Sequence, residues 1–263
     1  MISLRIRGGE RPASHAVRRR WAAGLLAVTG VMALCVLWID VPLAWYFRRN
    51  TLFFDGFAAL ITLWGDSRWA LSISLLGWAL GRIVGRRLAD PHGKERARRL
   101  ALACGFVFLS VASSGLLVNG LKFLFGRARF NALMLRGEYG FYFFQAGYDF
   151  SSFPSGHANT AMALAFALGY LWPRWRALLL LAGFMLALSR VVVTAHYLSD
   201  ALAGGLLGWW TTQWWRLWFQ RRYGLFAPTA AVAAEPAAVQ CVSPEEGGVA
   251  STSNWPTSTA SKP

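Results

Sequence analysis

Seven polar residues and one glycine stand at the edges of apolar stretches between residues 122 and 200, and their types could hold and transfer a phosphoryl group. They comprise two histidines, three cations, one carboxylate and a Ser-Gly pair, namely Lys122, Arg129, Ser155, Gly156, His157, Arg190, His196 and Asp200. A lone histidine or arginine at a membrane edge is more often an interfacial anchor than a catalytic residue. Their joint spacing favours phosphate chemistry.

Three cations could bind the phosphate oxygens. Lys122 supplies a point charge, whereas Arg129 and Arg190 carry planar forks that suit paired oxygens. Ser155 and Gly156 come directly before an apolar stretch that predicts a helix, and the free N–H groups of a helix start attract an anion. Ser155 is also a suitable N-cap residue, and Gly156 lets the backbone approach closely.

The spacing of the third group predicts a nucleophile and its partner. His196 and Asp200 are separated by one helical turn and would lie on one face of a helix. We therefore expect Asp200 to accept a hydrogen bond from one ring nitrogen of His196, leaving the other nitrogen free to attack phosphorus. A protonated His157 would donate to the departing oxygen, and water would then hydrolyse the phosphohistidine.

The three stretches resemble the signatures of the type 2 phosphatidic acid phosphatase (PAP2) family, which read K-x6-R-P, P-S-G-H and S-R-x5-H-x3-D. The second and third match in full, and the first keeps Lys122 and Arg129 but has Phe130 in place of proline. The resemblance spans Lys122 to Asp200 and implies the same roles. His196 would be the nucleophile, Asp200 its partner and His157 the general acid. The implied phosphate-binding residues are Lys122, Arg129, Ser155, Gly156 and Arg190.

A metal site is the alternative use of His157, His196 and Asp200. Three adjacent cations would repel a divalent ion, so the sequence predicts a site that works without metal or other cofactor. The three cysteines form neither a C-x-x-C motif nor an evident disulfide framework.

Composition indicates a membrane protein. The 263 residues are 56% hydrophobic and include 14 Trp, which is too apolar for an ordinary soluble domain. The net charge of +15 would suggest a nucleic-acid partner on a polar domain, but here the arginines lie between apolar stretches. We therefore predict an embedded protein that binds no nucleic acid.

The hydropathy pattern predicts an all-α bundle of six transmembrane helices with one additional interfacial helix. Residues 1–20 form a basic segment, 21–226 the membrane domain, and 227–263 a tail predicted to be disordered. The expected spans are 21–39, 69–85, 100–121, 156–172, 176–194 and 200–219. Residues 52–64 have an apolar stripe too short to span, which predicts a helix at the interface or a buried core helix. A cleaved signal peptide is the alternative for the first stretch.

Two connections are predicted to lack regular structure. One is a basic loop over 82–99, and the other is a long aromatic loop over 123–153. Small residues in the second span, among them Gly77 and Gly81, would allow close helix packing.

The distribution of basic residues predicts the orientation. With the N terminus inside, eight of the 27 basic residues fall outside, namely Arg48, Arg49, Arg68, Lys122, Arg127, Arg129, Arg136 and Arg190. The positive-inside rule thus favours cytoplasmic termini and an active site on the periplasmic side of a bacterial inner membrane.

These observations predict a lipid phosphatase or diphosphatase. Candidate substrates are undecaprenyl diphosphate, phosphatidylglycerol phosphate and the 1-phosphate of lipid A. The same residues would serve a lipid phosphotransferase, and the sequence does not separate the two or predict an oligomeric state. Vanadium haloperoxidases share such an anion site but are soluble. A transporter or scaffold would need polar residues deep within several spans, whereas these lie at one membrane edge.

Overall fold

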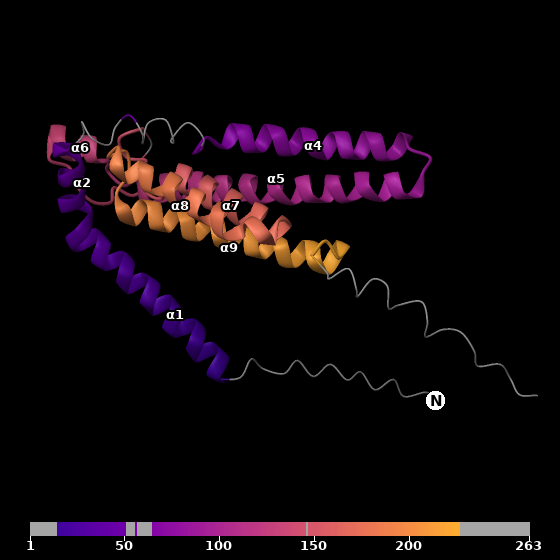
Figure 1. The fold of residues 1–263 in the computed structure, drawn as a ribbon. Coiled ribbons are helices and arrows are strands. Elements are labelled where there is room, and N and C mark those ends of the chain that lie inside the picture. Colours follow the sequence, from indigo (N-terminus) through magenta and orange to yellow (C-terminus); the bar gives the residue numbers. More distant parts are fainter. Residues whose placement is uncertain (1–14, 51–55, 57–64, 146, 227–263) are drawn as a thin grey trace, which may run out of the picture. The chain divides into compact units, whose positions relative to one another are not determined.

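The computed structural model describes residues 15–50, 56, 65–145 and 147–226. Every regular element in this part of the chain is helical, and the only β contact there is an isolated bridge between Arg127 and Phe141 (Figure 1). The prediction of an all-α protein is therefore confirmed for the described residues.

The first apolar stretch is one continuous helical segment that extends beyond its predicted end. It comprises α1 (His15–Leu34), the π-helical turn η1 (Cys35–Ile39) and α2 (Asp40–Arg49). We predicted a span that stops at residue 39, where the apolar pattern meets Asp40. The helix continues because Asp40 is buried against polar partners from elsewhere in the fold, as described below.

The helices α4 (Ser67–Arg87) and α5 (Pro91–Phe125) pack along each other. The predicted basic loop over 82–99 is therefore wrong, since only residues 88–90 separate the two helices. Arginine and lysine are good helix formers, and Asp90 caps α5 through the N–H of Gly93. Glu95 adds ion pairs to Arg98 and Arg99 at helical spacing.

Glycine permits the close approach of α4 to α5, as predicted. A Cβ atom on Gly77 would lie 2.6 Å from Sγ of Cys104, and one on Gly81 would lie 2.9 Å from the backbone of Ala101. A larger residue at Gly81 would push the two helix backbones apart, whereas one at Gly77 would first displace the Cys104 side chain.

The central helix of the fold is α7 (Gly156–Leu171), which packs against α5, α8 (Arg176–Val192) and α9 (Leu198–Tyr223). A short 3₁₀ turn, η3 (Pro173–Trp175), joins α7 to α8. This packing brings the N-terminal ends of α7 and α9 and the C-terminal ends of α5 and α8 to one end of the bundle.

Close contact between α7 and α9 depends on two glycines of α9. A Cβ atom on Gly204 would lie 2.3 Å from the carbonyl oxygen of Ser155, and one on Gly208 would lie 2.5 Å from that of Asn159. The same approach allows the N–H of Ser155 to donate to the carbonyl oxygen of Asp200 at 2.9 Å.

The aromatic segment between α5 and α7 is more regular than predicted, since it contains α6 (Phe130–Arg136). The predicted loop over 123–153 is wrong for its first part. Phe130 is 1% exposed, and its ring packs edge-on against Trp45 of α2 and against Tyr197. This burial supplies α6 with a core contact that hydropathy alone did not reveal.

Three helical segments of the described chain are long and apolar enough to cross a membrane: Ala22–Arg49, Pro91–Phe125 and Pro173–Val192. Six spans remain a prediction, as do the domain boundaries. The predicted interfacial helix over 52–64 lies, except for Gly56, outside the described residues, and so do the tail and most of the basic N-terminal segment.

Candidate active site

The structure brings the predicted site residues together at one end of the bundle. Lys122 lies in the last turn of α5, His157 in the first turn of α7 and Arg190 in the last turn of α8. His196 lies in the turn between α8 and α9, where it interacts electrostatically with Lys122, Arg190 and Arg129. Residues distant in sequence thus form one cluster of cations around an imidazole.

His196 is oriented by a backbone carbonyl. Its Nδ1 atom lies 2.8 Å from the carbonyl oxygen of Ser152, and the residue is 4% exposed. A carbonyl oxygen only accepts hydrogen bonds, so Nδ1 must carry the hydrogen. The Nε2 atom of neutral His196 is therefore unprotonated and carries the lone pair that a nucleophile needs.

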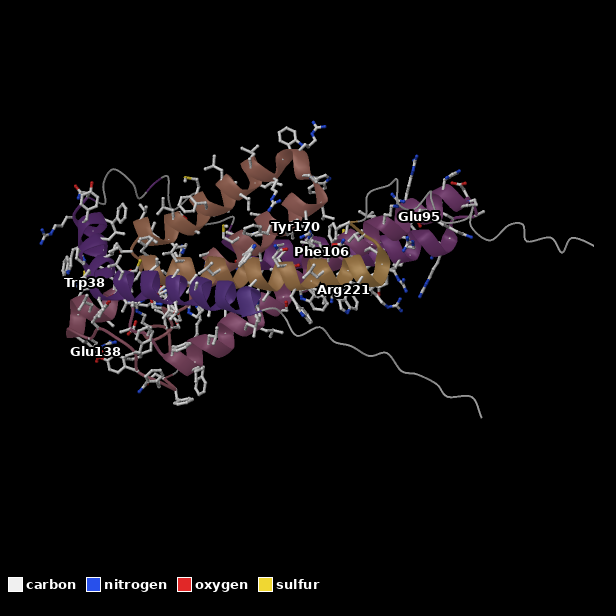
Figure 2. The ribbon with its side chains drawn as sticks, turned by 90° about the horizontal axis from the view of Figure 1, so that it is seen from below. Trp38, Glu95, Phe106, Glu138, Tyr170 and Arg221 are labelled. Atoms are coloured by element: carbon white, nitrogen blue, oxygen red, sulfur yellow. The ribbon has the colours of Figure 1, made fainter. Side chains whose placement is uncertain are left out.

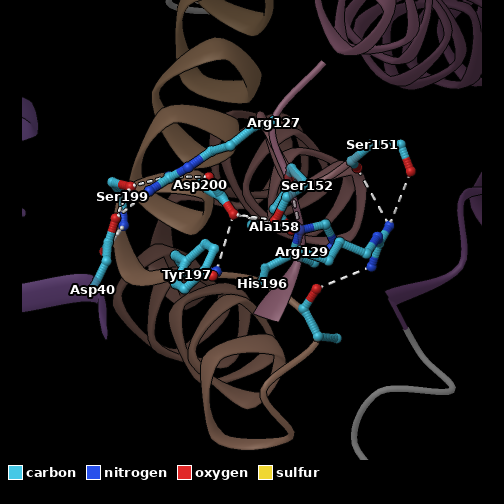
Figure 3. A network of polar contacts seen from close by, with 12 residues as sticks. Asp40, Arg127, Arg129, Ser151, Ser152, Ala158, His196, Tyr197, Ser199 and Asp200 are labelled. Atoms are coloured by element: carbon cyan, nitrogen blue, oxygen red, sulfur yellow. Dashed lines mark hydrogen bonds and ion pairs between the residues drawn. The ribbon is translucent and has the colours of Figure 1, made fainter. Parts of the chain in front are cut away.

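The expected direct hydrogen bond between His196 and Asp200 is absent. Oδ2 of Asp200 lies 3.9 Å from Nδ1 of His196, beyond hydrogen-bond distance. The carboxylate instead accepts from the Ser152 hydroxyl at 2.6 Å and from the N–H of Tyr197 at 2.9 Å. His196 precedes α9 rather than lying on it, so the one-turn spacing does not align the two side chains as predicted. Ser152 links them (Figure 3).

Ser152 was missed in the sequence because serine is common in loops. Its three polar groups are all used, and the residue is wholly buried: the carbonyl accepts from His196, the hydroxyl donates to Asp200, and the N–H donates to the carbonyl of Arg127. The available signal was its place two residues before the P-S-G-H stretch.

The start of α7 agrees with the sequence expectation. Ser155 is the N-cap, and its Oγ accepts from the N–H of Ala158 at 3.4 Å. Gly156 is the first helical residue, and a Cβ atom there would lie 3.9 Å from Nζ of Lys122. The ammonium group therefore lies beside the free N–H groups of a helix start, an arrangement that favours an anion.

Arg129 holds the loop around His196. Its Nη1 donates to the carbonyl of Ala195 at 2.9 Å, and its Nε donates to the carbonyl of Tyr148 at 2.8 Å. The guanidinium also lies 4.2 Å from the centre of the Tyr148 ring. A residue predicted only to bind phosphate thus has several of its donors directed at the backbone on both sides of the site.

His157 contacts a segment that the sequence analysis did not connect with the site. A Cβ atom on Gly65 would lie 2.9 Å from Cδ2 of His157, so the backbone before α4 rests against the imidazole. The adjacent Asp66 interacts electrostatically with His157 and is held by Arg68 through a 2.7 Å hydrogen bond from Nε.

A buried ionic cluster supports Asp200 from behind. Arg127 is wholly buried and forms ion pairs with Asp200 at 2.5 Å and with Asp40 of α2 at 2.8 Å (Figure 3). Ser199 donates to Asp40 through both its N–H, at 3.0 Å, and its hydroxyl, at 2.5 Å, and it accepts from Arg127. The N-terminal helical segment is therefore fastened to the start of α9.

Aromatic rings surround the Arg127 guanidinium, with the centre of the Tyr197 ring 4.6 Å away and that of Phe141 5.2 Å away. Desolvating a charge is expensive, and the two carboxylates offset that penalty only because the hydrogen-bond geometry is close. Sequence reasoning missed both Arg127 and Asp40. The available signal was a lone carboxylate at the end of a long apolar stretch.

Electrostatics distinguish the two sides of this network. Burial, followed by the nearby cations Arg129, Lys122 and Arg190, lowers the pKa of His196 well below its usual value, so the neutral ring is favoured. Burial also opposes the charge on Arg127, but Asp200 and Asp40 outweigh it and raise the pKa of that guanidinium. The network thus combines the neutral imidazole of His196 with the permanently charged guanidinium of Arg127.

The described residues contain no group of three or more histidine, cysteine, aspartate or glutamate side chains placed to hold a metal ion. The charges that could stabilise a phosphate in this part of the chain are those of Lys122, Arg129 and Arg190.

Comparison with known proteins agrees with the motif resemblance. Residues 103–223 match the model of the PAP2 superfamily. The lipid A 1-phosphatase of Rhizobium etli is 35% identical over 191 residues, which cover 73% of this chain and 82% of that protein. The lipid A 1-phosphatase of Rhizobium johnstonii is 34% identical over 191 residues, covering 73% and 78%.

No solved structure shows a significant match to the chain. The region that matches the family model contains α7, α8, α9 and nearly all of the site residues. The similarity to the two relatives extends over most of this chain and most of each relative. On this evidence the chain belongs to the PAP2 superfamily.

Proposed function

We propose that this membrane lipid phosphatase hydrolyses a phosphate ester on a lipid headgroup through a phosphohistidine intermediate on His196. The observation that carries the proposal is the fixed tautomer of His196, whose Nδ1 is bound to the Ser152 carbonyl while Nε2 remains available among three cations. A neutral nucleophile held beside cations is suited to attack an anionic phosphoryl group.

The first chemical step forms a bond between Nε2 of His196 and phosphorus and breaks the bond from phosphorus to the lipid oxygen. His157 in its protonated form donates its proton to that departing oxygen, so that a neutral lipid alcohol leaves. Lys122, Arg190 and the N–H groups at the start of α7 stabilise the charge on the non-bridging oxygens.

The second step regenerates the enzyme. A water molecule gives a proton to the now neutral His157 and attacks phosphorus, breaking the bond to Nε2 and releasing inorganic phosphate. The imidazole of His196 returns to the tautomer that the Ser152 carbonyl favours. Asp200 takes no proton in this scheme and acts by holding Ser152 and the turn that carries His196.

We infer that the 1-phosphate of lipid A is the first substrate to test, because both similar relatives bear that activity in their names. Undecaprenyl diphosphate and phosphatidylglycerol phosphate remain in the substrate panel. The proposed location is a bacterial inner membrane, with six spans, both termini in the cytoplasm and the active site facing the periplasm. The proposed mechanism needs no metal, since cations of the protein perform the charge stabilisation.

The test is phosphate release by the purified protein in detergent. Lipid A carrying only a 1-phosphate is compared with lipid A carrying only a 4′-phosphate, with the other two lipids and with glycerol phosphate. We expect turnover of a lipid phosphate, unchanged activity in EDTA, competitive inhibition by vanadate and complete loss in His196→Ala. Normal turnover by His196→Ala would refute the nucleophile, and loss in EDTA with recovery on adding a divalent ion would refute metal independence.

A further inference from the structure

A cavity lies between α4, α5 and α9, far from the candidate active site. Its volume is about 570 Å³. Arg98, at this cavity, precedes Lys122 on the same helix by about 24 residues, which corresponds to roughly 36 Å along the axis. Figure 2 shows the neighbouring Glu95 at the opposite end of the bundle from Glu138. The cavity therefore lies at the other end of the helical bundle.

The walls of this cavity divide into an apolar and a cationic part. Leu102, Leu109 and Phe219 line it on the side nearer the middle of the helices, and the indole rings of Trp78 and Trp218 also line it. Four cations line it nearer the α4–α5 connection, namely Arg82, Arg86, Lys94 and Arg98. Apolar walls below a cationic rim match the order of acyl chain and phosphate in a phospholipid.

The charge of the rim is largely unbalanced. Arg98 forms an ion pair with Glu95. Across the residues that the structure describes, none of the ion pairs involves Arg82, Arg86 or Lys94. No acidic residue lines the cavity. An anion would therefore meet a concentrated positive potential without displacing an existing partner.

Basic residues at a membrane face are common, and Arg87, Arg96 and Arg221 are such exposed residues in the same helices. They do not line the cavity. What separates Arg82, Arg86 and Lys94 from them is convergence from two helices onto one concavity with apolar walls. A general attraction to the membrane surface needs no such cavity.

We propose that this cavity is a binding site for an anionic phospholipid, separate from the active site. The phosphodiester lies among Arg82, Arg86 and Lys94, and an acyl chain runs along Leu102 and Leu109. A bound lipid would join α4, α5 and α9, three helices that extend toward the active site, and would stabilise the folded protein.

The experiment compares two triple variants of the full chain that lose the same charge. Arg82→Gln/Arg86→Gln/Lys94→Gln removes the rim cations, and Arg87→Gln/Arg96→Gln/Arg221→Gln is the matched control. Each is delipidated in neutral detergent and titrated with dioleoyl phosphatidylglycerol, dioleoyl phosphatidylcholine or inorganic phosphate. Bound lipid is counted by native mass spectrometry, and Tm is measured in parallel.

We expect phosphatidylglycerol to raise the Tm of the parent and of the control by about 5 °C and to remain bound to both. The rim variant should shift by less than about 1 °C, although its lipid-free Tm equals that of the parent because the substituted side chains are exposed. Equal loss in both variants, equal binding of phosphatidylcholine, or the same shift with inorganic phosphate would each overturn the proposal. A lipid-free rim variant that unfolds several degrees earlier than the control would also contradict it.

Discussion

Nδ1 of His196 lies 2.8 Å from the carbonyl oxygen of Ser152, whereas it lies 3.9 Å from Oδ2 of Asp200. The partner of the imidazole is therefore the main chain of the segment before α7. No side-chain replacement removes a carbonyl group, so the orientation of His196 depends on where that segment is held. Two hydrogen bonds fix the position of this segment. The Ser152 hydroxyl donates to the Asp200 carboxylate, and the Ser152 N–H donates to the Arg127 carbonyl.

This arrangement predicts graded effects of substitutions at the two residues. Ser152→Ala removes the hydroxyl bond but keeps the carbonyl, so we expect kcat/KM to fall by about 10- to 100-fold. Asp200→Asn also weakens the ion pair to Arg127 and the bond from Tyr197, and it should lower kcat/KM by about 10³-fold. Steady-state kinetics on the purified variants measure both.

The comparison is with Ser151→Ala, whose hydroxyl donates to the Tyr148 carbonyl and accepts a long hydrogen bond, 3.4 Å, from Nη2 of Arg129, which keeps its other contacts to the Ala195 and Tyr148 carbonyls. It should stay within about threefold of the parent. If Ser152→Ala were as active as Ser151→Ala while Asp200→Asn was inactive, then Asp200 would act on His196 directly and the linking role of Ser152 would be wrong.

The buried cluster predicts a large effect on stability from a residue outside the phosphate site. Asp40→Asn leaves Arg127 with one full carboxylate partner in a site with no solvent exposure, and breaking such a pair costs about 3–5 kcal/mol. We expect a clearly lower Tm for Asp40→Asn and for Arg127→Met in detergent. Activity should be lost together with the fold as temperature rises.

Arg136 provides the comparison, because its ion pairs to Glu138 and Asp149 are partly exposed. Arg136→Gln should cost less than about 1 kcal/mol. The double variant Asp40→Asn/Arg127→Met should be less destabilised than the sum of its single changes, since the buried charge and its partner are removed together. Additive effects would show that Asp40 and Arg127 do not stabilise each other.

The contact between Gly65 and His157 predicts a catalytic defect from adding one methyl group. Gly65→Ala places Cβ 2.9 Å from Cδ2 of His157, so the imidazole must turn away from its position. We expect kcat to fall by about tenfold or more with little change in KM, because proton donation depends on the angle of the ring.

Gly120→Ala is a matched control in α5, where a Cβ atom would meet nothing within 4 Å. It should leave kcat unchanged and stabilise the helix slightly. Gly65→Ala with normal kcat would mean that the segment before α4 can yield without moving His157, and the role assigned to that contact would be wrong.

The lowered pKa of His196 predicts how the protein responds to acid. Burial and neighbouring cations keep the ring neutral when folded, whereas the unfolded chain protonates it near pH 6.5. The unfolded state therefore binds an extra proton below that pH, and the stability contributed by this neutral His196 is complete above about pH 6.5 and declines as the pH falls.

Measuring Tm of the parent and of His196→Gln between pH 8 and pH 4.5 isolates this effect. The difference between the two curves should change with pH below about 6.5 and be constant above it. Activity should not lose its nucleophile at pH 6.5, because the folded ring remains neutral there. A parallel pair of Tm curves would show that His196 titrates normally in the folded protein.

The sequence predicted the family and the set of residues that meet at the site, because each motif is local and adjoins an apolar stretch. It failed on their connections. Spacing indicated that His196 and Asp200 share a helical face, but the helix begins only at Leu198 and Ser152 enters between them. Such a linker is determined by tertiary packing, which no local pattern reports.

The extent of the helices was misjudged for a related reason. Polar residues were taken as the ends of apolar spans, whereas α5 begins at Pro91 and the first helical segment continues through Asp40 to Arg49. In both cases polar side chains have partners. Glu95 forms an ion pair with Arg99 within α5, and Asp40 forms one with Arg127, which lies far from it in the sequence. Long-range partners such as Arg127 lie outside any window of sequence.

Sidedness decides which lipids the enzyme can reach, and the structure supplies positions at which to test it. Leu135 of α6 is 79% exposed near the site, and Ala89 is exposed between α4 and α5 at the other end of the bundle. We expect a cysteine at Leu135 to react with a membrane-impermeant thiol reagent once the outer membrane is opened. A cysteine at Ala89 should react only after lysis.

Cys241→Ser removes the native cysteine beyond the described helices, while Cys35 is buried and Cys104 half-buried. A reporter that fluoresces only in the cytoplasm should light up when fused after Phe226, because the positive-inside rule places the residues with most of the basic charge inside. These labels report topology without needing activity. If Leu135→Cys reacted only after lysis and Ala89→Cys reacted before it, the active site would face the cytoplasm, and a substrate exposed only at the periplasmic surface would be excluded.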